Sequence, residues 1–239
     1  MQVLIDNVGG LPALIVEPET KQCDSTVLLF LHGKGEAGST PNEIPMVCLH
    51  QTPPFQAMLG RLPGTTVVAP QAPPIPSKDE WNWAEHLNAL VEFFCSEPFM
   101  GRRLVATGFS RGGLGVLQLV SAAPNLISSW AVVDPQPPRN EEEARTLLNS
   151  PAMGDRGWVR YGVYRTRSAA WQKFSSDLAT KIPPENYDIT ELSHPEMALR
   201  AYNGSALSKS PKSSLYRFTS LEFPEPAIER GRENQTRHE

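Results

Sequence analysis

The chain has 239 residues, of which 40% are hydrophobic and 20% charged, proportions typical of a folded globular protein that can bury a sizeable core. A net charge of −4 and a pI of about 5.8 argue against nucleic acid or an anionic membrane surface as a partner. No apolar run reaches the ~18 residues that span a bilayer, and the opening MQVLIDNVGG lacks the basic and apolar regions of a signal peptide.

Apolar runs typical of β-strands alternate along the chain with segments of helical spacing. The run QVLID and residues 11–18 predict an opening hairpin. The other predicted strands cover residues 25–33, 65–71, 102–110, 128–135, 157–166 and 186–193. The predicted helices cover residues 81–94, 111–124, 141–150, 168–182 and 213–223. Because strands that are apolar throughout are buried on both faces, we expect one doubly wound, mostly parallel α/β domain over residues 1–223.

Two segments stand outside this alternation. Residues 39–64 are rich in proline and apolar residues, and they form either a flap or cap over a site or a long packed loop with one short helix. Residues 224–239 are polar, and we expect a disordered tail there.

The cysteines bear on the cellular compartment. They are odd in number and far apart, at Cys23, Cys48 and Cys95. This pattern favours reduced intracellular thiols over a disulfide framework, and none of the three has the spacing of a metal ligand. We therefore expect a cytoplasmic protein.

A serine lies where a predicted strand turns into a predicted helix. In LVATGFSRGGLGVLQLV, the residues Gly108, Ser110 and Gly112 form a Gly-x-Ser-x-Gly pattern. A serine in this strand-turn-helix context sits in strained backbone that flanking glycines relieve, at a helix N-terminus that favours a developing anion. We interpret Ser110 as a catalytic nucleophile; the alternative is a structural turn serine.

A serine hydroxyl needs a base to take its proton, and histidine is the usual choice. Of the five histidines, only His194 follows Ser110 within the predicted fold. It comes after the last predicted strand, so parallel pairing places it at the same carboxyl edge of the sheet as Ser110. We expect His194 to be the base; the alternative is a histidine that starts a helix near Pro195.

A developing oxyanion needs hydrogen-bond donors, which backbone N–H groups supply in such turns. One donor is expected at Arg111, directly after the serine, and the second at Lys34 in the turn HGKGEAG after the third strand. The flanking glycines would let the backbone approach the substrate, and aromatic side chains either line an acyl or aryl pocket or belong to the core. The candidates for substrate contact are Gly33, Gly35, Phe109 and Trp83.

In these stretches the sequence resembles the α/β-hydrolase superfamily. The nearest resemblance is to its carboxylesterase/phospholipase-like branch, which includes acyl-protein thioesterases and dienelactone-hydrolase-like esterases. The matching pieces are LLFLHGKGEAG, VVAPQAP with the tryptophans of WNW, RRLVATGFSRGG and SHPEM. The resemblance implies the α/β-hydrolase fold and ester or thioester hydrolysis. It also implies Ser110 as nucleophile, His194 as base, and Lys34 with Arg111 as backbone oxyanion donors.

The acid of the triad departs from the pattern of that branch. There an aspartate follows the seventh strand, whereas the corresponding stretch here, YGVYRTRSAAW, holds no acid. Asp134 ends the sixth predicted strand at the catalytic edge, and the order Ser110, Asp134, His194 agrees with the order serine, acid, histidine of the fold. We expect Asp134 to orient the histidine; Glu191, or no acid at all, is the alternative.

These residues predict a serine hydrolase that cleaves a small-molecule carboxylic ester or thioester through an acyl-enzyme, with no metal or organic cofactor. Two other functions share the same features. One is an acyltransferase or cyclase that passes the acyl group to an acceptor other than water. The other is a non-catalytic small-molecule-binding protein that retains the fold; the missing aspartate favours it weakly, while the intact serine turn and His194 oppose it. Acyl-chain preference and oligomeric state do not follow from the sequence.

Overall fold

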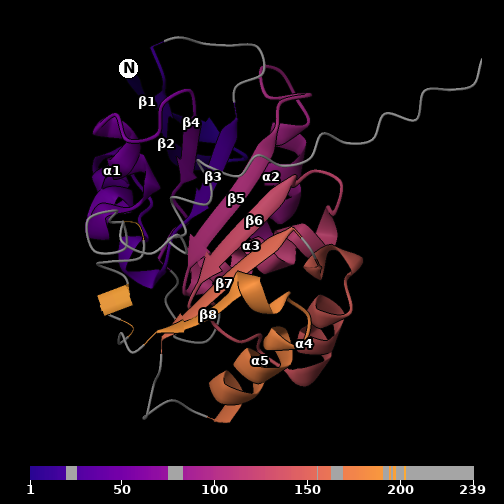
Figure 1. Cartoon of the computed structure of the whole chain (residues 1–239). Coiled ribbons are helices and arrows are strands. Elements are labelled where there is room, and N and C mark those ends of the chain that lie inside the picture. Colours follow the sequence, from indigo (N-terminus) through magenta and orange to yellow (C-terminus); the bar gives the residue numbers. More distant parts are fainter. Residues whose placement is uncertain are drawn as a thin grey trace, which may run out of the picture.

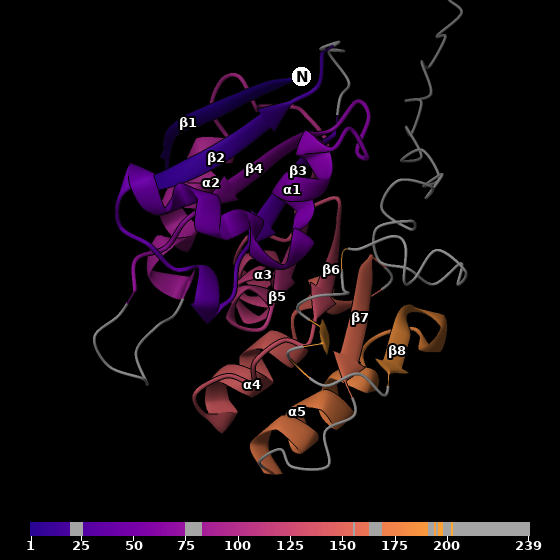
Figure 2. The same ribbon diagram turned by 90° about the vertical axis from the view of Figure 1, so that its left-hand side faces the viewer.

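The computed structural model contains an eight-stranded sheet flanked by helices (Figure 1; Figure 2). The structure describes residues 1–19, 26–74, 83–154, 156–162, 169–190, 194, 196, 197 and 202. The strands are β1 (Gln2–Val8), β2 (Leu11–Glu17), β3 (Val27–Leu31), β4 (Thr66–Pro70), β5 (Leu104–Phe109), β6 (Ser129–Val133), β7 (Gly157–Gly162) and β8 (Tyr187–Thr190). The α-helices are α1 (Pro53–Met58), α2 (Leu87–Phe94), α3 (Arg111–Ala122), α4 (Glu141–Leu148) and α5 (Ala169–Ala179). Short 3-10 helices are η1 (Lys34–Glu36), η2 (Pro41–Gln51), η3 (Trp83–His86), η4 (Pro151–Met153) and η5 (Pro184–Asn186).

The strands run in the order β1-β2-β4-β3-β5-β6-β7-β8 across the sheet. The hairpin strands β1 and β2 pair antiparallel, β2 pairs antiparallel with β4, and every later pair is parallel. Parallel strands bring their carboxyl ends to one edge of the sheet. The residues that follow β3, β5, β6 and β8 therefore gather at that edge, and these are the strands after which the candidate site residues come.

The strands are apolar throughout because the sheet is buried on both faces. Along β3, Leu28 packs into one core and Leu29 into the other. The face of Leu29 is covered by α2, α3, α4 and α5. The face of Leu28 is covered by η2 and α1, through Ile44, Val47 and Ala57. The predicted doubly wound, mostly parallel α/β architecture is thus confirmed.

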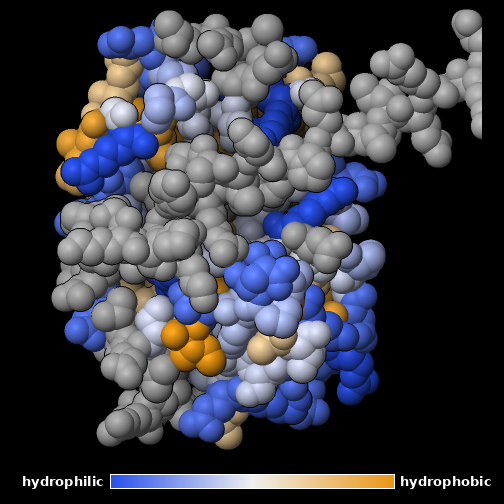
Figure 3. Space-filling view, viewed as in Figure 1, coloured by the Kyte–Doolittle hydropathy of each residue, from blue (hydrophilic) through white to orange (hydrophobic). Residues whose placement is uncertain are grey.

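The segment 39–64 folds into η2 and α1 and packs on the sheet. Ile44 and Val47 are fully buried there, whereas Leu49 and Leu59 are exposed. Figure 3 shows hydrophobic residues at the margin of the molecule over α1, and mostly hydrophilic residues over α5. Some apolar residues of this segment thus pack into the core on the Leu28 face of the sheet, and others are exposed at the surface.

Tyr202 also packs on this face of the sheet. Its ring meets that of Phe30 edge-on, with 5.6 Å between the ring centroids. Its hydroxyl and that of Thr107 on β5 are hydrogen-bonded at 3.2 Å. The chain beyond β8 thereby contributes to the core over β3 and β5.

The predicted helices at 81–94, 111–124, 141–150 and 168–182 correspond to η3 with α2, α3, α4 and α5. The last three end before the predicted C-terminal residue, and residues 81, 82 and 168 lie outside the described residues. The predicted helix 213–223, the tail 224–239 and Glu191 lie outside the described residues. Over the ranges that the structure describes, no helix combines the length and the apolar character needed to cross a membrane.

Candidate active site

Ser110 occupies a sharp turn between β5 and α3. Its backbone has φ 55° and ψ −116°, a conformation that L-residues rarely adopt and that costs on the order of 1–3 kcal/mol. Two hydrogen bonds fix the turn to the end of β6: the Ser110 N–H donates to the Val133 C=O at 3.0 Å, and the Ser110 C=O accepts from the Gln136 N–H at 2.9 Å. The fold thus holds the serine at the carboxyl end of β5, at the N-terminus of α3.

Gly108 and Gly112 allow this turn because a side chain at either position would collide with backbone. A Cβ atom at Gly108 would lie 2.3 Å from the carbonyl oxygen of Gly112, and one at Gly112 would lie 1.8 Å from the carbonyl oxygen of Leu31. Both separations are far below van der Waals contact. The second one shows how closely the serine turn approaches the end of β3, from which the HGKG turn continues.

Asp134 follows β6 directly and is fully buried. Its Oδ2 atom accepts a hydrogen bond from Nδ1 of His194, and its backbone N–H donates to the C=O of Arg160 on β7 at 2.6 Å. A neutral imidazole that donates from Nδ1 presents an acceptor at Nε2. This is the protonation state that a general base requires.

The imidazole of His194 lies against the residue that precedes Ser110. It stacks on the ring of Phe109, with 4.6 Å between the ring centroids and 25° between the planes. The indole of Trp171 on α5 approaches it edge-on at 6.1 Å. Because Phe109 is bonded to Ser110, this stack sets the imidazole beside the serine turn. The structure therefore brings Ser110, Asp134 and His194 together at the carboxyl edge of the sheet.

The HGKG turn is held by the fully buried His32. Its Nδ1–H donates to the C=O of Gly33 at 2.6 Å, and its Nε2 accepts the N–H of Ala72 at 2.9 Å. Burial lowers the pKa of His32 to about 4, so the ring is neutral at pH 7, as the acceptor role of Nε2 requires. The turn leads into η1, whose first residue is Lys34.

Of the other predicted site residues, some lie at the two turns and one lies in the core. Arg111 is the first residue of α3, and Gly33 lies against Phe109, whose Cδ1 would be 3.3 Å from a Cβ on that glycine. Gly35 is exposed. Trp83, in contrast, is 1% exposed and lies in the core, where its Nε1–H donates to the C=O of His32 at 3.3 Å. Trp83 thus contacts the inner side of the turn.

Two residues that the sequence did not single out lie beside this turn. Glu36 is only 3% exposed, and burial raises the pKa of its carboxyl group to about 7. The Nε2 atom of His50, in η2, lies 3.7 Å from Oε1 of Glu36. The sequence contains no local signal for Glu36, because a carboxylate in a surface turn is ordinarily exposed.

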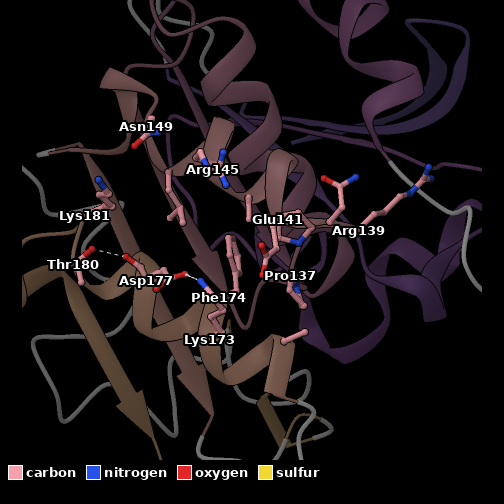
Figure 4. A pocket seen from close by; sticks show the side chains of 15 residues that line it. Pro137, Arg139, Glu141, Arg145, Asn149, Lys173, Phe174, Asp177, Thr180 and Lys181 are labelled. Atoms are coloured by element: carbon pink, nitrogen blue, oxygen red, sulfur yellow. Dashed lines mark hydrogen bonds and ion pairs between the residues drawn. The ribbon is translucent and has the colours of Figure 1, made fainter.

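A groove of about 430 Å³ runs between α4 and α5 (Figure 4). Its lining includes the apolar Leu148 and Phe174 and the basic Arg145 and Lys181. Along its side, Lys173 donates to Asp177 at 2.6 Å. None of Ser110, Asp134 and His194 lines this groove, so it is separate from the residues gathered at the serine turn.

No protein-family model matches this sequence, and no curated protein does. Solved structures do match. An esterase from the bacterial hormone-sensitive lipase family has a TM-score of 0.59 and 14% identity, over 91% of this chain and 83% of that one. A thioesterase domain from the curacin biosynthetic pathway has a TM-score of 0.53 and 13% identity, over 87% of this chain and 98% of that one.

A thermostable esterase matches 87% of this chain with a TM-score of 0.51 and 18% identity. This chain covers 61% of that esterase, less than two thirds of its length. At such identities the likeness concerns the fold. Together with the eight-stranded sheet and its parallel order, it shows that the chain has the α/β-hydrolase fold.

Proposed function

We propose that the protein is a serine hydrolase that cleaves a carboxylic ester or thioester through an acyl-enzyme. One observation carries the proposal: the imidazole of His194 is hydrogen-bonded to the buried Asp134 and stacked on Phe109, beside a serine held in strained backbone. A nucleophile, a base and a group that orients the base are the three parts that acyl transfer to serine needs.

In the first half of the proposed reaction, Oγ of Ser110 attacks the substrate carbonyl carbon while Nε2 of His194 takes the hydroxyl proton. The buried carboxylate of Asp134 holds the Nδ1–H of the imidazole and stabilises the imidazolium that forms. When the tetrahedral intermediate collapses, the bond to the alcohol or thiol breaks, and the leaving group receives the proton from His194. The product of this half is an ester between the acyl group and Ser110.

In the second half, His194 takes a proton from water, and the resulting hydroxide attacks the acyl-serine. Collapse of this second intermediate releases the carboxylic acid and returns the proton to Ser110. In both halves the negative charge on the carbonyl oxygen would be met by the backbone N–H groups of Lys34 and Arg111. Loss of one such donor costs roughly 10²–10³-fold in turnover.

Both ester and thioester substrates agree with this chemistry, because the leaving group differs and the nucleophile does not. The similar structures include esterases and a thioesterase domain, which supports the class of acyl substrate and leaves the leaving group open. A panel of p-nitrophenyl esters and matched acyl thioesters of short and long chain would rank the two, since p-nitrophenol and the free thiol are each measured by absorbance.

A fluorophosphonate probe tests the nucleophile directly. We expect the folded wild type to be labelled at Ser110, Ser110→Ala to remain unlabelled, and both to show the same thermal unfolding midpoint within a few degrees. His194→Gln should slow labelling strongly, because the serine then lacks its base. A folded wild type that is neither labelled nor active on any ester of the panel would instead favour a binding protein that retains the fold.

A further inference from the structure

We propose that Glu36 is a positioning residue for the oxyanion loop, which comprises residues 32–36, and that His50 is its charge partner. The inference rests on the proposed function, since it concerns the loop that would present the Lys34 N–H to the substrate. It assigns to two residues outside the proposed triad the task of holding that donor in place.

The first observation is that the Glu36 carboxylate closes the oxyanion loop on itself. The side chain is buried, and the backbone N–H groups of Glu36 itself and of Gly33 favour the ionised form of its carboxyl group, although burial outweighs them and raises its pKa. The carboxyl oxygen Oε2 would lie 3.2 Å from a Cβ atom on Gly33. The carboxyl group therefore lies against Gly33 at the start of the loop.

The opposite side of Gly33 is held by His32. The Gly33 C=O accepts the Nδ1–H of His32 at 2.6 Å. This carbonyl and the N–H of Lys34 belong to one planar trans peptide, so they point in opposite directions. Fixing the carbonyl therefore fixes the direction of the Lys34 N–H. His32 thus fixes the peptide that follows Gly33, and the Glu36 carboxyl group packs against the same glycine, which favours the rigidity that an oxyanion donor requires.

The loop is also tied to η2, the element that carries His50. The Nε2 atom of Gln71 donates to the backbone carbonyl of Glu36 at 2.8 Å and to that of Glu43 at 2.9 Å. Near the end of η2, His50 has φ 61° and ψ 24°, in the left-handed region that side-chain-bearing residues rarely occupy. In that conformation its Nε2 lies 3.7 Å from Oε1 of Glu36, close enough for a protonated ring to favour the ionised carboxylate.

The charge of Glu36 changes in the neutral range, because burial raises its pKa to about 7. The titratable groups that face it from other elements are His50 of η2 and Tyr202; His32 and Lys34 share its loop. The hydroxyl of Tyr202 stays neutral, since burial raises its pKa. An ionised carboxylate makes a hydrogen bond to an N–H about twice as strong as a neutral carboxyl does. The oxyanion loop should therefore be best ordered above neutral pH.

Activity should then fall toward acid pH as Glu36 takes up a proton. We would measure kcat and KM on a p-nitrophenyl ester from about pH 5 to about pH 9 for the wild type, Glu36→Gln, His50→Gln and Glu43→Gln. In the wild type the logarithm of kcat/KM should fall more steeply toward acid pH than in Glu36→Gln, because only the wild type loses the carboxylate on protonation. Glu36→Gln should also lower the plateau of kcat roughly 10–100-fold with little change in KM, since oxyanion donors act in the transition state.

The other two variants separate positioning from a general loss of charge. His50→Gln should shift the Glu36 limb, because it replaces the ring whose Nε2 lies 3.7 Å from Oε1 of Glu36 with a side chain that cannot be protonated. Glu43→Gln is the matched control. This carboxylate also lies in η2, but Glu43 is only half-buried and its carboxylate accepts hydrogen bonds from the backbone N–H groups of Ser39 and Thr40. Its variant should keep the wild-type profile.

A readout that does not need activity is the amide proton of Gly33. In Ser110→Ala, the NMR chemical shift of this proton should follow pH with a midpoint near that of Glu36, because the neighbouring Glu36 carboxyl group changes charge. In Ser110→Ala combined with Glu36→Gln, the shift should no longer titrate. Dispersed spectra of both proteins would show that the comparison is made between folded chains.

The outcomes separate this inference from the proposed function. A wild type that shows Ser110-dependent turnover, with Glu36→Gln keeping the wild-type acid limb and kcat, would overturn the role of Glu36 alone. So would a Gly33 amide proton that ignores pH. A folded wild type with neither turnover nor labelling of Ser110 would overturn the proposed function, and the role of Glu36 with it.

Discussion

Asp134 and His194 are joined by a hydrogen bond between Oδ2 and Nδ1 although 60 positions separate them in the chain. The acid reaches the imidazole from the end of β6. Because β6 and β7 are neighbours in the sheet, an acid after either strand stands at the same edge. The stretch YGVYRTRSAAW after β7 holds no acid. The carboxylate that contacts the histidine instead follows the neighbouring strand, β6.

Asp134→Asn should lower kcat on an activated ester by about 10⁴-fold, because an amide no longer selects the imidazole tautomer with its acceptor at Nε2. The KM should change little, since Asp134 is buried and would not touch the substrate. Steady-state kinetics on p-nitrophenyl butyrate, with circular dichroism to confirm folding, would measure both.

The comparison variant is Glu191→Gln, which removes the other acid that the sequence left open. We expect it to retain kcat within a few fold. If Glu191→Gln were the more damaged of the two, Asp134 would lose the orienting role.

The close packing of the serine turn against β3 predicts that a side chain at Gly112 destabilises the fold. Alanine there would place a Cβ 1.8 Å from the carbonyl oxygen of Leu31, so β3 and α3 would have to move apart. We expect Gly112→Ala to lower the free energy of unfolding by roughly 3 kcal/mol or more, measured by urea titration. Gly35→Ala is the control, because among the described residues no atom beyond the neighbouring chain lies within 4 Å of its Cβ position; a similar loss in both variants would refute the steric argument.

Much of this arrangement follows from local sequence patterns. The apolar strands predicted the parallel sheet because burial on both faces leaves little room for polar side chains. The turn at Ser110 was predictable because strand, glycine turn and helix are adjacent in the chain. His194 could be selected from its order, since it is the only later histidine before the tail.

The remaining features depend on contacts between distant segments. From the sequence, Trp83 could belong to the core or to a pocket wall. Its place beneath His32 follows only from the packing of η3 on α3. His50 approaches Glu36 because η2 packs against η1, the short helix that carries Glu36. Neither the burial of a carboxylate nor the charge partner it meets is encoded in a local pattern of residues.

Tyr202 tests whether the chain beyond β8 stabilises the sheet. Tyr202→Phe removes the hydroxyl that is hydrogen-bonded to Thr107 and should lower the free energy of unfolding by about 1 kcal/mol. Tyr202→Ala also empties the space beside Phe30 and should lower it by about 3–5 kcal/mol. Urea titrations with both variants would give the difference, and equal effects of the two substitutions would show that the ring is not packed.

The last prediction concerns pH and stability, because two buried groups of the oxyanion loop titrate in opposite senses. Burial raises the pKa of Glu36 from 4.5 to about 7, so the folded state binds the extra proton and stability falls as pH rises through that interval. Burial lowers the pKa of His32 from 6.5 to about 4, so the unfolded state binds the extra proton and stability rises with pH from about 4 to 6.5. Each effect amounts to about 3 kcal/mol.

In the wild type these two contributions should nearly cancel between about pH 4.5 and 6.5. Glu36→Gln removes one of them and leaves that of His32. The free energy of unfolding of the variant, measured by urea titration at closely spaced pH values, should therefore rise relative to the wild type by roughly 3 kcal/mol across this interval. Parallel curves for wild type and variant would show that Glu36 titrates normally in the folded protein, and would remove the physical basis for its effect on the oxyanion loop.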